Sequence, residues 1–362
     1  MSNHTINEYE PDSVSPPGET LLETIEALGM SQAELAERTG RPRKTINEII
    51  KGKAGITPET ALQFEKVLGV PASYWNNHER IYREYLARKG ESEQLSPRVD
   101  WLKEFPVRAM VKFGWINESQ DKVQMLRELL AFFGIASPDQ WQTVWDRPHV
   151  AYRKSSTFQA DPGAISVWLR KGEIEAQKIE CAPFDATMFQ TALVQVRAMT
   201  RLTRDVFEPE VRRICAEAGV AWVLVPEMPA SRVCGATRWL GPSKALMQLS
   251  LRYKSDDHFW FTFFHEAGHI LLHGRKDVFV EADSVDDPRE QEANDFAANF
   301  LIPPSRFNEF IASAGSLSKE GIKAFAEEIG IAPGIVVGRL QKEERIPFKN
   351  CNELKQKLEW RD

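Results

Sequence analysis

Residues 263–273, FFHEAGHILLH, are the stretch that most decides the fold of this 362-residue sequence. Apolar residues run up to His265 and continue after His269, which predicts a helix buried on all sides. Residues four apart on a helix share one face, so the imidazoles of His265 and His269 can reach the same metal ion. Glu266 lies beside them, where a general base for metal-activated water belongs. The stretch therefore predicts a catalytic zinc site, although such ligands could also hold manganese or iron.

A catalytic zinc ion needs a third protein ligand, and residues 290–303, EQEANDFAANFLIP, are predicted to supply it from a second helix. The small side chains of Ala293 and Ala297 would let that helix approach the first one closely. Gly268 would allow the same approach from the other side.

Three acidic residues of this second helix are candidates for the third ligand. Glu292 is preferred, because it adjoins Ala293 and lies one turn before Phe296. Periodicity alone does not exclude Glu290 or Asp295. A solvated acidic first turn that complements the helix dipole is the alternative interpretation.

Together the two stretches resemble the ImmA/IrrE metallopeptidases, whose pattern is HExxH, a histidine shortly after it, and a later E-A-N-x-F-A-A helix. The similarity covers about residues 205–305. It implies a zincin-like fold and endopeptidase activity on regulatory proteins such as repressors. It also implies that His265, His269 and Glu292 bind zinc and that Glu266 is the base. His273, four residues after His269, could support the site, touch substrate or cap the helix.

Residues 30–53, MSQAELAERTGRPRKTINEIIKGK, predict a helix-turn-helix. The first helix runs over 32–38, Thr39 and Gly40 form the turn, and the second helix runs over 42–50. Ala36 is small, as the tight crossing of two helices requires.

The same region is locally basic, with six basic residues and one acidic residue between 38 and 53, on a chain of net charge -6. Such a cluster suits binding to DNA phosphates. A solvated basic helix in a protein-interaction module is the alternative. The side chains predicted to contact DNA are Arg41, Arg43, Lys44, Thr45, Asn47 and Lys51.

Residues 17–89 as a whole resemble the Cro/C1-type helix-turn-helix of HigA-like antitoxins. The resemblance implies operator binding as a homodimer, autoregulation and a toxin partner. Those antitoxins usually lack a peptidase domain, so the fusion departs from their pattern.

Composition indicates a globular protein, with 42% hydrophobic and 27% charged residues. No apolar run approaches the roughly 18 residues that span a bilayer. The four cysteines lie far apart, which argues against a disulfide scaffold and suits a reducing cytoplasm. The sequence therefore predicts a cytoplasmic protein that does not interact with membranes.

The predicted fold class is mainly α with a small α+β domain, whose strands fall near 220–225, 235–239 and 245–249. The expected organisation comprises a flexible leader (1–18), the helix-turn-helix domain (19–89), a linker (90–97), a helical middle region (98–205), the zinc peptidase domain (206–310) and a C-terminal helical extension (311–362).

Two functions agree with these patterns. The first is a DNA-binding transcriptional regulator whose zinc endopeptidase domain cleaves a repressor- or antitoxin-like protein, or this chain itself, in a stress, toxin-antitoxin or mobile-element circuit. The second is an antitoxin and autorepressor whose zincin-like domain senses or scaffolds without proteolysis.

Overall fold

The computed structural model describes residues 13–153, 161–274, 279–280, 287–313 and 317–360. The chain divides into two compact units, residues 1–99 and 100–362. The described residues of the first unit form helices and no strand, and the second unit combines helices with a small sheet, so the predicted fold class is confirmed. None of the helices in the described part of the chain combines the length and hydrophobicity of a bilayer-spanning segment.

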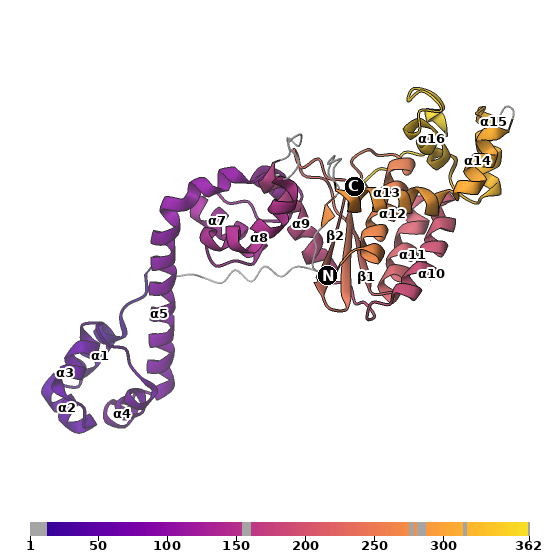
Figure 1. Cartoon of the computed structure of the whole chain (residues 1–362). Helices are drawn as coiled ribbons and strands as arrows, with labels where there is room; N and C mark the ends of the chain where they lie inside the picture. Colours follow the sequence, from indigo (N-terminus) through magenta and orange to yellow (C-terminus); the bar gives the residue numbers. More distant parts are fainter. Residues whose placement is uncertain (1–12, 154–160, 275–278, 281–286, 314–316, 361–362) are drawn as a thin grey trace. The chain divides into compact units, whose positions relative to one another are not determined.

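The first unit is built from helices with clear sequence signals at their ends. Ser31 Oγ accepts a hydrogen bond from the Glu34 backbone N–H at 3.2 Å, and Gly40 ends the same helix with a φ of 67°. Thr57 caps another helix, in which Pro58 takes the first position. The helices are α1 (Pro17–Ala27), α2 (Gln32–Thr39), α3 (Arg43–Ile50), α4 (Pro58–Leu68) and α5 (Ala72–Leu95) (Figure 1).

One apolar core holds these helices together. Its largest side chains are those of Phe64 and Trp75, whose rings meet edge to face at 5.5 Å. Helix α1 crosses the end of α3 so closely that a Cβ on Gly18 would lie 2.2 Å from the Ile49 carbonyl oxygen. The helix-turn-helix segment is therefore fixed in a unit with its own core.

Helices extend across two of the predicted boundaries in this unit. The predicted linker at 90–97 is helical, because α5 continues to Leu95 and a 3₁₀ segment, η1 (Ser96–Glu104), follows directly. An Arg88–Glu84 ion pair at 3.0 Å supports the helix just before Gly90. The predicted leader at 1–18 ends earlier, since α1 begins at Pro17; its residues 1–12 lie outside the described part of the chain.

The second unit is organised around a sheet in the order β1-β3-β2-β4. Strands β1 (Val220–Leu224) and β3 (Lys244–Leu249) are parallel, whereas β2 (Gly235–Gly241) runs antiparallel to β3 and to the short β4 (Phe279–Val280). The three predicted strands are confirmed.

Helices cover both faces of this sheet (Figure 1). Alternate residues of β1 show the arrangement, since Val220 and Trp222 join one core while Ala221 and Val223 join the other. The second core is completed by α6 (Val107–Lys112), α7 (Lys122–Phe133), α8 (Pro138–Arg153) and α9 (Pro162–Gln177).

Within the residue ranges given above, the face with the first core carries seven helices. They are α10 (Ala186–Ala198), α11 (Arg204–Glu217), α12 (Asp256–Leu272), α13 (Pro288–Leu301), α14 (Pro304–Ala312), α15 (Lys319–Glu328) and α16 (Pro333–Lys342). Of these, α12 and α13 supply the residues of the site. Two 3₁₀ segments, η2 (Met199–Arg201) and η3 (Asn352–Leu354), also lie in this unit. The region predicted as a helical middle therefore contributes to both faces of the sheet, and the predicted boundaries after residues 205 and 310 fall inside α11 and α14.

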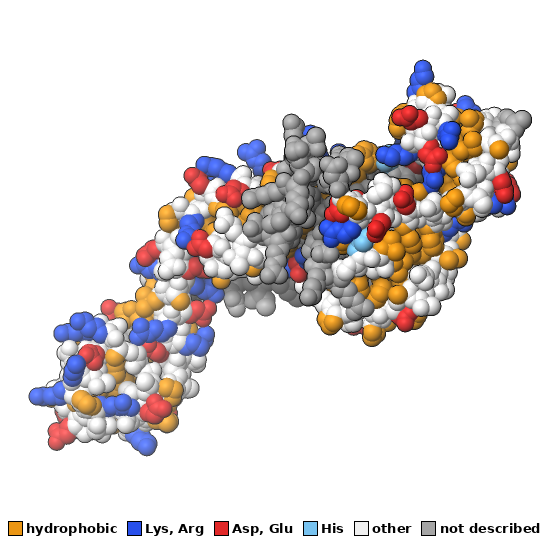
Figure 2. Space-filling view, in the orientation of Figure 1, with side chains coloured by type: hydrophobic (Ala, Val, Ile, Leu, Met, Phe, Trp, Pro, Cys, Tyr) orange, Lys and Arg blue, Asp and Glu red, His pale blue; other side chains and the backbone are white. Residues whose placement is uncertain are grey.

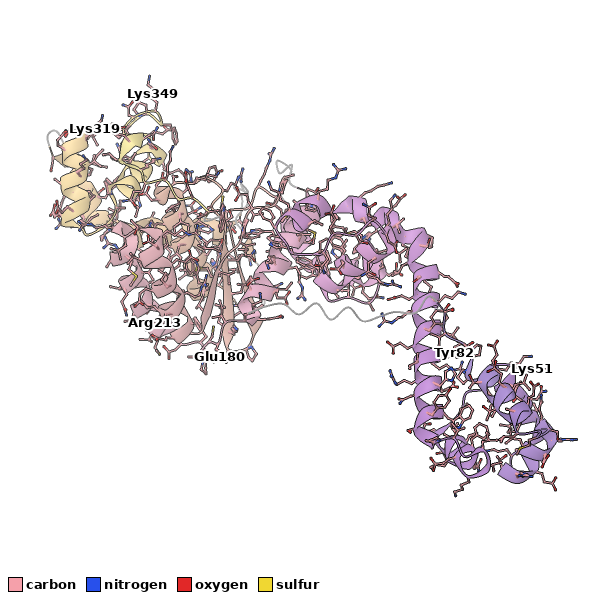
Figure 3. The ribbon with its side chains drawn as sticks, turned by 180° about the vertical axis from the view of Figure 1, so that it is seen from behind. Lys51, Tyr82, Glu180, Arg213, Lys319 and Lys349 are labelled. Carbon is pink, nitrogen blue, oxygen red and sulfur yellow. The ribbon has the colours of Figure 1, made fainter. Side chains whose placement is uncertain are left out.

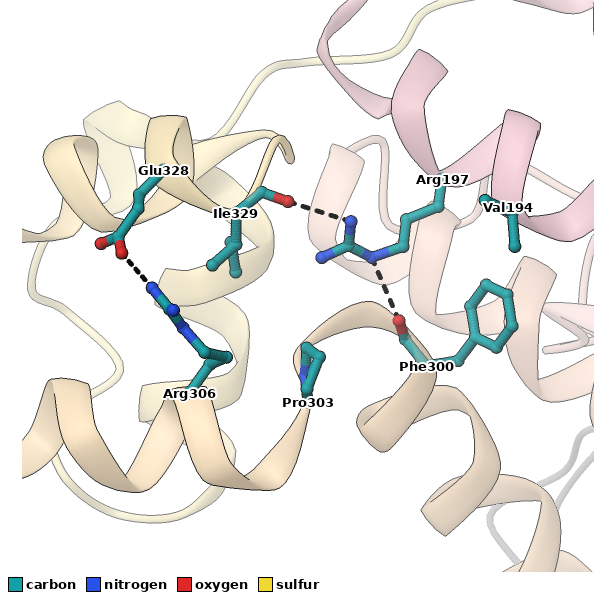
Figure 4. A pocket seen from close by; sticks show the side chains of 7 residues that line it. All are labelled: Val194, Arg197, Phe300, Pro303, Arg306, Glu328 and Ile329. Carbon is teal, nitrogen blue, oxygen red and sulfur yellow. Dashed lines mark hydrogen bonds and ion pairs between the residues drawn. The ribbon is translucent and has the colours of Figure 1, made fainter.

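One arginine connects three of these helices. The guanidinium of Arg197 on α10 donates hydrogen bonds to the carbonyl oxygens of Phe300 and Leu301 at the end of α13 and of Ile329 after α15 (Figure 4). Burial lowers the pKa of this arginine. Arg197 thereby holds the end of α13 in place, about three helical turns from the metal-site end of the same helix.

Candidate metal centre and helix-turn-helix surface

Helix α12 carries the HExxH residues through the centre of the second unit. The helix spans Asp256–Leu272, and so includes the whole HExxH stretch for which the sequence predicted a helix. Its apolar side chains pack against the sheet, α13 and α16, as expected of a helix that is hydrophobic all round. A buried histidine on such a helix needs a polar partner or a metal ion.

The structure brings the two predicted histidines together. His265 Nε2 and His269 Nε2 lie 3.0 Å apart, and each residue is only 1% exposed. Their rings cross at 79° with centroids 4.7 Å apart, so both Nε2 atoms converge on one point.

Glu290, in the first turn of α13, completes the group. Its Oε2 lies 3.1 Å from His265 Nε2, and its Oε1 lies 3.5 Å from His269 Nε2. These three residues are the one set of histidine, cysteine and acidic side chains, among the described residues, that converges closely enough to hold a metal ion.

The protonation states in this group favour a cation. Burial raises the pKa of Glu290, but its hydrogen bonds with His265 and His269 outweigh burial and bring that pKa to about 2, so the carboxylate is ionised. Burial lowers the pKa of His269, which keeps this imidazole neutral. Neutral histidine and ionised glutamate are the forms that ligate metals.

Asn294 fixes the orientation of the first histidine. Its Oδ1 lies 3.0 Å from His265 Nδ1, and an amide oxygen can only accept, so Nδ1 carries the proton. His265 Nε2 is then the ring atom available to a metal ion. Two imidazole nitrogens and a carboxylate that converge within 3.0–3.5 Å form a donor set that fits a divalent ion.

The structure does not bring Glu292, the preferred third ligand, to the pair of metal-site histidines. Glu292 is two residues from Glu290 and therefore on another face of α13; its side chain is 63% exposed and pairs with His273 at 3.2 Å. Asp295 is also exposed and accepts a hydrogen bond from Gln291 at 2.9 Å. Sequence reasoning left Glu290 open, and it missed Asn294 entirely.

Glu266, the predicted base, is completely buried between α12 and β2. A Cβ on Gly235 would lie 2.5 Å from Glu266 Oε1, so only glycine leaves room for this carboxylate. Thr237 Oγ1 donates to the Glu266 carbonyl oxygen at 3.3 Å and ties the helix to the strand.

Close packing of α12 and α13 brings the ligands within reach of one another. Ala293 and Ala297 are fully buried, and a Cβ on Gly268 would lie 3.2 Å from Ala293 Cα. The predicted role of these small residues is confirmed.

The helix-turn-helix surface lies on the first unit. Ile46 and Ile49 anchor α3 in the core, which leaves the opposite face of the helix to solvent. Of the residues predicted to contact DNA, Arg43, Lys44 and Lys51 are exposed (Lys51 is labelled in Figure 3), and basic side chains also stand out on this unit in Figure 2.

The other predicted contact residues are less exposed. Thr45 and Asn47 are half-buried on α3. Arg41 is half-buried as well, and its Nε donates to Gln63 Oε1 on α4 at 2.7 Å. Lys44 lies 3.8 Å from Glu48, an exposed pair that leaves the lysine able to reach a phosphate.

The fold and the site define a helix-turn-helix unit and a second unit whose HExxH helix carries a candidate metal site. Residues 21–75 match the family model described as helix-turn-helix, and residues 240–341 match the peptidase family described as the IrrE N-terminal-like domain. The chain therefore carries an XRE-type helix-turn-helix DNA-binding domain and an ImmA/IrrE-like domain, as the two resemblances predicted.

Two curated relatives share part of the sequence. The chain is 38% identical over 52 residues to virulence-associated protein A of Dichelobacter nodosus and 31% identical over 61 residues to the uncharacterized HTH-type transcriptional regulator YddM of Escherichia coli strain K12. The matches cover 14% and 17% of this chain, and 51% and 65% of those proteins. The chain thus spans only about half to two thirds of the length of these relatives.

Solved structures show a similar partial likeness. One is an addiction module antidote protein of the HigA family from Coxiella burnetii, with 30% identity, coverage of 23% of this chain and 91% of that one, and a TM-score of 0.22. Another is Pseudomonas aeruginosa antitoxin HigA with the higBA promoter, with 25% identity, coverage of 23% and 91%, and a TM-score of 0.22.

Proposed function

We propose that this protein is a DNA-binding transcriptional regulator with a zinc-dependent endopeptidase domain that cleaves a regulatory protein of repressor or antitoxin type. The observation that carries the proposal is the convergence of His265 Nε2, His269 Nε2 and the Glu290 carboxylate within 3.0–3.5 Å, beside Glu266. The match to a peptidase family over residues 240–341 supports it.

The chain's own residues have distinct tasks in peptide hydrolysis. A zinc ion held by His265, His269 and Glu290 supplies a Lewis acid that acidifies water and polarises a carbonyl. Glu266 accepts the proton of the attacking water and returns it to the leaving amide nitrogen. Burial of Glu266 against Gly235 holds the carboxylate in place for both transfers.

The DNA-binding domain directs this activity to an operator in double-stranded DNA. Arg43, Lys44 and Lys51 would contact phosphates, and Thr45 and Asn47 would face the major groove. We place the protein in the cytoplasm, where it has access to that DNA. We also propose that the protein acts as a homodimer, in which a second copy would cover the exposed apolar side chains Ile81 and Leu86 of the long helix α5.

The alternative function is an antitoxin and autorepressor that binds a toxin partner and uses the metal domain as a sensor or scaffold. One observation favours it: His265, Glu266 and His269 are at most 1% exposed, which suits a structural metal better than an open catalytic one. In this alternative the DNA-binding role is unchanged.

Glu266→Gln separates the two functions. The amide keeps the size of the side chain but cannot accept the proton, so the variant should bind zinc and DNA like the wild type. The proteins of cells that carry each form are then compared for fragments, including fragments of this chain itself. Cleavage products that depend on Glu266 support the peptidase; identical fragments and identical operator control in both forms would contradict it.

A further inference from the structure

His273, just beyond the end of α12, belongs to a hydrogen-bonded chain that begins at a metal-site histidine. Its side chain is only 4% exposed. Its Nδ1 lies 2.9 Å from His269 Nδ1, and its Nε2 lies 3.2 Å from Glu292 Oε2. Both ring nitrogens are therefore engaged by side chains, so the histidine does not use them to cap the helix.

The proton positions in the hydrogen-bonded series His269–His273–Glu292 follow from the groups at either end, the metal-site histidine and the carboxylate. When His269 binds a metal ion through Nε2, its proton lies on Nδ1, which donates to His273 Nδ1 at 2.9 Å. His273 accepts at Nδ1 and therefore carries its own proton on Nε2, which donates to Glu292. An ionised carboxylate can only accept, so Glu292 requires a proton on His273 Nε2. The hydrogen bond from His269 to His273 requires the same proton position.

The other metal-site histidine has a simpler support. Asn294 on α13 accepts from His265 Nδ1 at 3.0 Å. Helix α13 thus supports both metal-site histidines. Asn294 contacts His265 directly, whereas Glu292 contacts His273, which in turn contacts His269. Phe279 adds a stacked ring over His269, with centroids 4.2 Å apart and an angle of 14°.

We propose that His273 and Glu292 are positioning residues that hold His269 in the tautomer and ring orientation needed for metal binding through Nε2. The proposal rests on the metal centre of the proposed function, but not on its peptidase activity. Outer partners of metal-bound histidines fix ring orientation and raise ligand basicity, and their loss typically lowers metal affinity by about 10–100-fold. Glu292, which the sequence favoured as a ligand, then supports the metal centre through its hydrogen bond with His273 and does not bind the metal itself.

The test is the zinc affinity of the full chain, measured by competition with a chromophoric chelator, together with the visible spectrum of the cobalt-substituted protein. His273→Ala should lower the affinity about 10–100-fold and alter the cobalt spectrum. His273→Asn places an amide oxygen near the position of Nδ1, where it can accept from His269, and should restore most of the affinity. Glu292→Ala, at an exposed position that does not threaten the fold, should lower it up to about 10-fold.

Asp295→Ala is the matched control, since it removes another exposed acid from the same helix, and should leave affinity and spectrum unchanged. Wild-type affinity and spectrum in both His273→Ala and Glu292→Ala would overturn the proposal, as would His273→Asn binding no better than His273→Ala. Wild-type protein that binds no zinc would overturn the metal centre and this proposal together. A wild type that binds zinc but cleaves nothing contradicts only the peptidase function.

Discussion

At the residue scale, the metal site depends on which carboxylate joins the two histidines. Glu290 lies within 3.5 Å of both Nε2 atoms, whereas Glu292 contacts only His273. Glu290→Ala should therefore lower zinc affinity by more than the roughly 10–100-fold that the loss of an outer partner causes.

Glu292→Ala is the natural comparison, because it removes the same functional group two residues away. We expect its loss of affinity, measured by the same chelator competition, to be clearly the smaller of the two. A greater loss for Glu292→Ala than for Glu290→Ala would restore Glu292 as the ligand.

The HExxH residues were predictable because both histidines lie on one helix, whose geometry is known in advance. The third ligand comes from a second helix, so it depends on how the two helices cross. One signal was present: Glu290, Ala293 and Ala297 follow the i, i+3, i+7 spacing of a single face. Glu292 adjoins Ala293 in sequence but points about 100° away from it around the helix.

At the scale of elements, the close approach of α12 and α13 sets the distance between the ligands. Ala293→Leu would force side-chain atoms into the contact with Gly268, where a Cβ added to Gly268 would lie only 3.2 Å from Ala293 Cα. Overpacking of this kind costs about 1–3 kcal/mol of unfolding free energy, and it should also move Glu290 away from the histidines and weaken zinc binding.

Chemical denaturation and zinc titration of the full chain check this expectation. Gln291→Leu adds the same side chain at an exposed position of α13 and should change neither quantity by much. If Ala293→Leu resembled Gln291→Leu, the helix contact would not control the site.

The start of α12 contains a buried acid whose charge opposes folding. Burial, and next the neighbouring Asp257, raise the pKa of Asp256 to about 7. Its unfolded pKa is near 3.9, so the folded state binds the extra proton and stability should fall as pH rises from about 4 to about 7. A difference of that size corresponds to about 4 kcal/mol.

Asp256→Asn removes this titration and should stabilise the protein at pH 8 but hardly at pH 4, as measured by denaturation at both values. Asp257→Asn should instead destabilise at pH 8, because Asp257 pairs with Lys355 at 2.6 Å. A pH dependence that is the same in Asp256→Asn and the wild type would contradict this assignment.

Element boundaries were less predictable than element types. The polar composition at 90–97 indicated a linker, yet local ion pairs and good helix formers carry α5 through Gly90 to Leu95. Likewise, the helices between 98 and 205 carry no motif, so their division between the two faces of the sheet follows only from long-range packing.

At the scale of the whole molecule, the helix-turn-helix unit and the helices of the candidate metal site have separate cores. Arg43→Ala combined with Lys44→Ala should weaken operator binding and reduce the slope of affinity against salt by about 1 for each phosphate that the variant no longer neutralises. Zinc affinity should remain unchanged, because both residues lie on the first unit.

Lys66→Ala, which removes one exposed charge from α4 instead, serves as the control for loss of a positive charge away from α3. Operator affinity is measured over a series of salt concentrations. A salt slope identical to that of the wild type would exclude α3 as the DNA-reading helix.

The zinc content of the purified full chain tests the central claim most directly. The wild type and Glu266→Gln should each hold one zinc ion per chain, whereas His265→Ala and His269→Ala should hold none at the same free zinc concentration. A wild type without zinc, or histidine variants that retain it, would contradict the metal centre on which the proposed function rests.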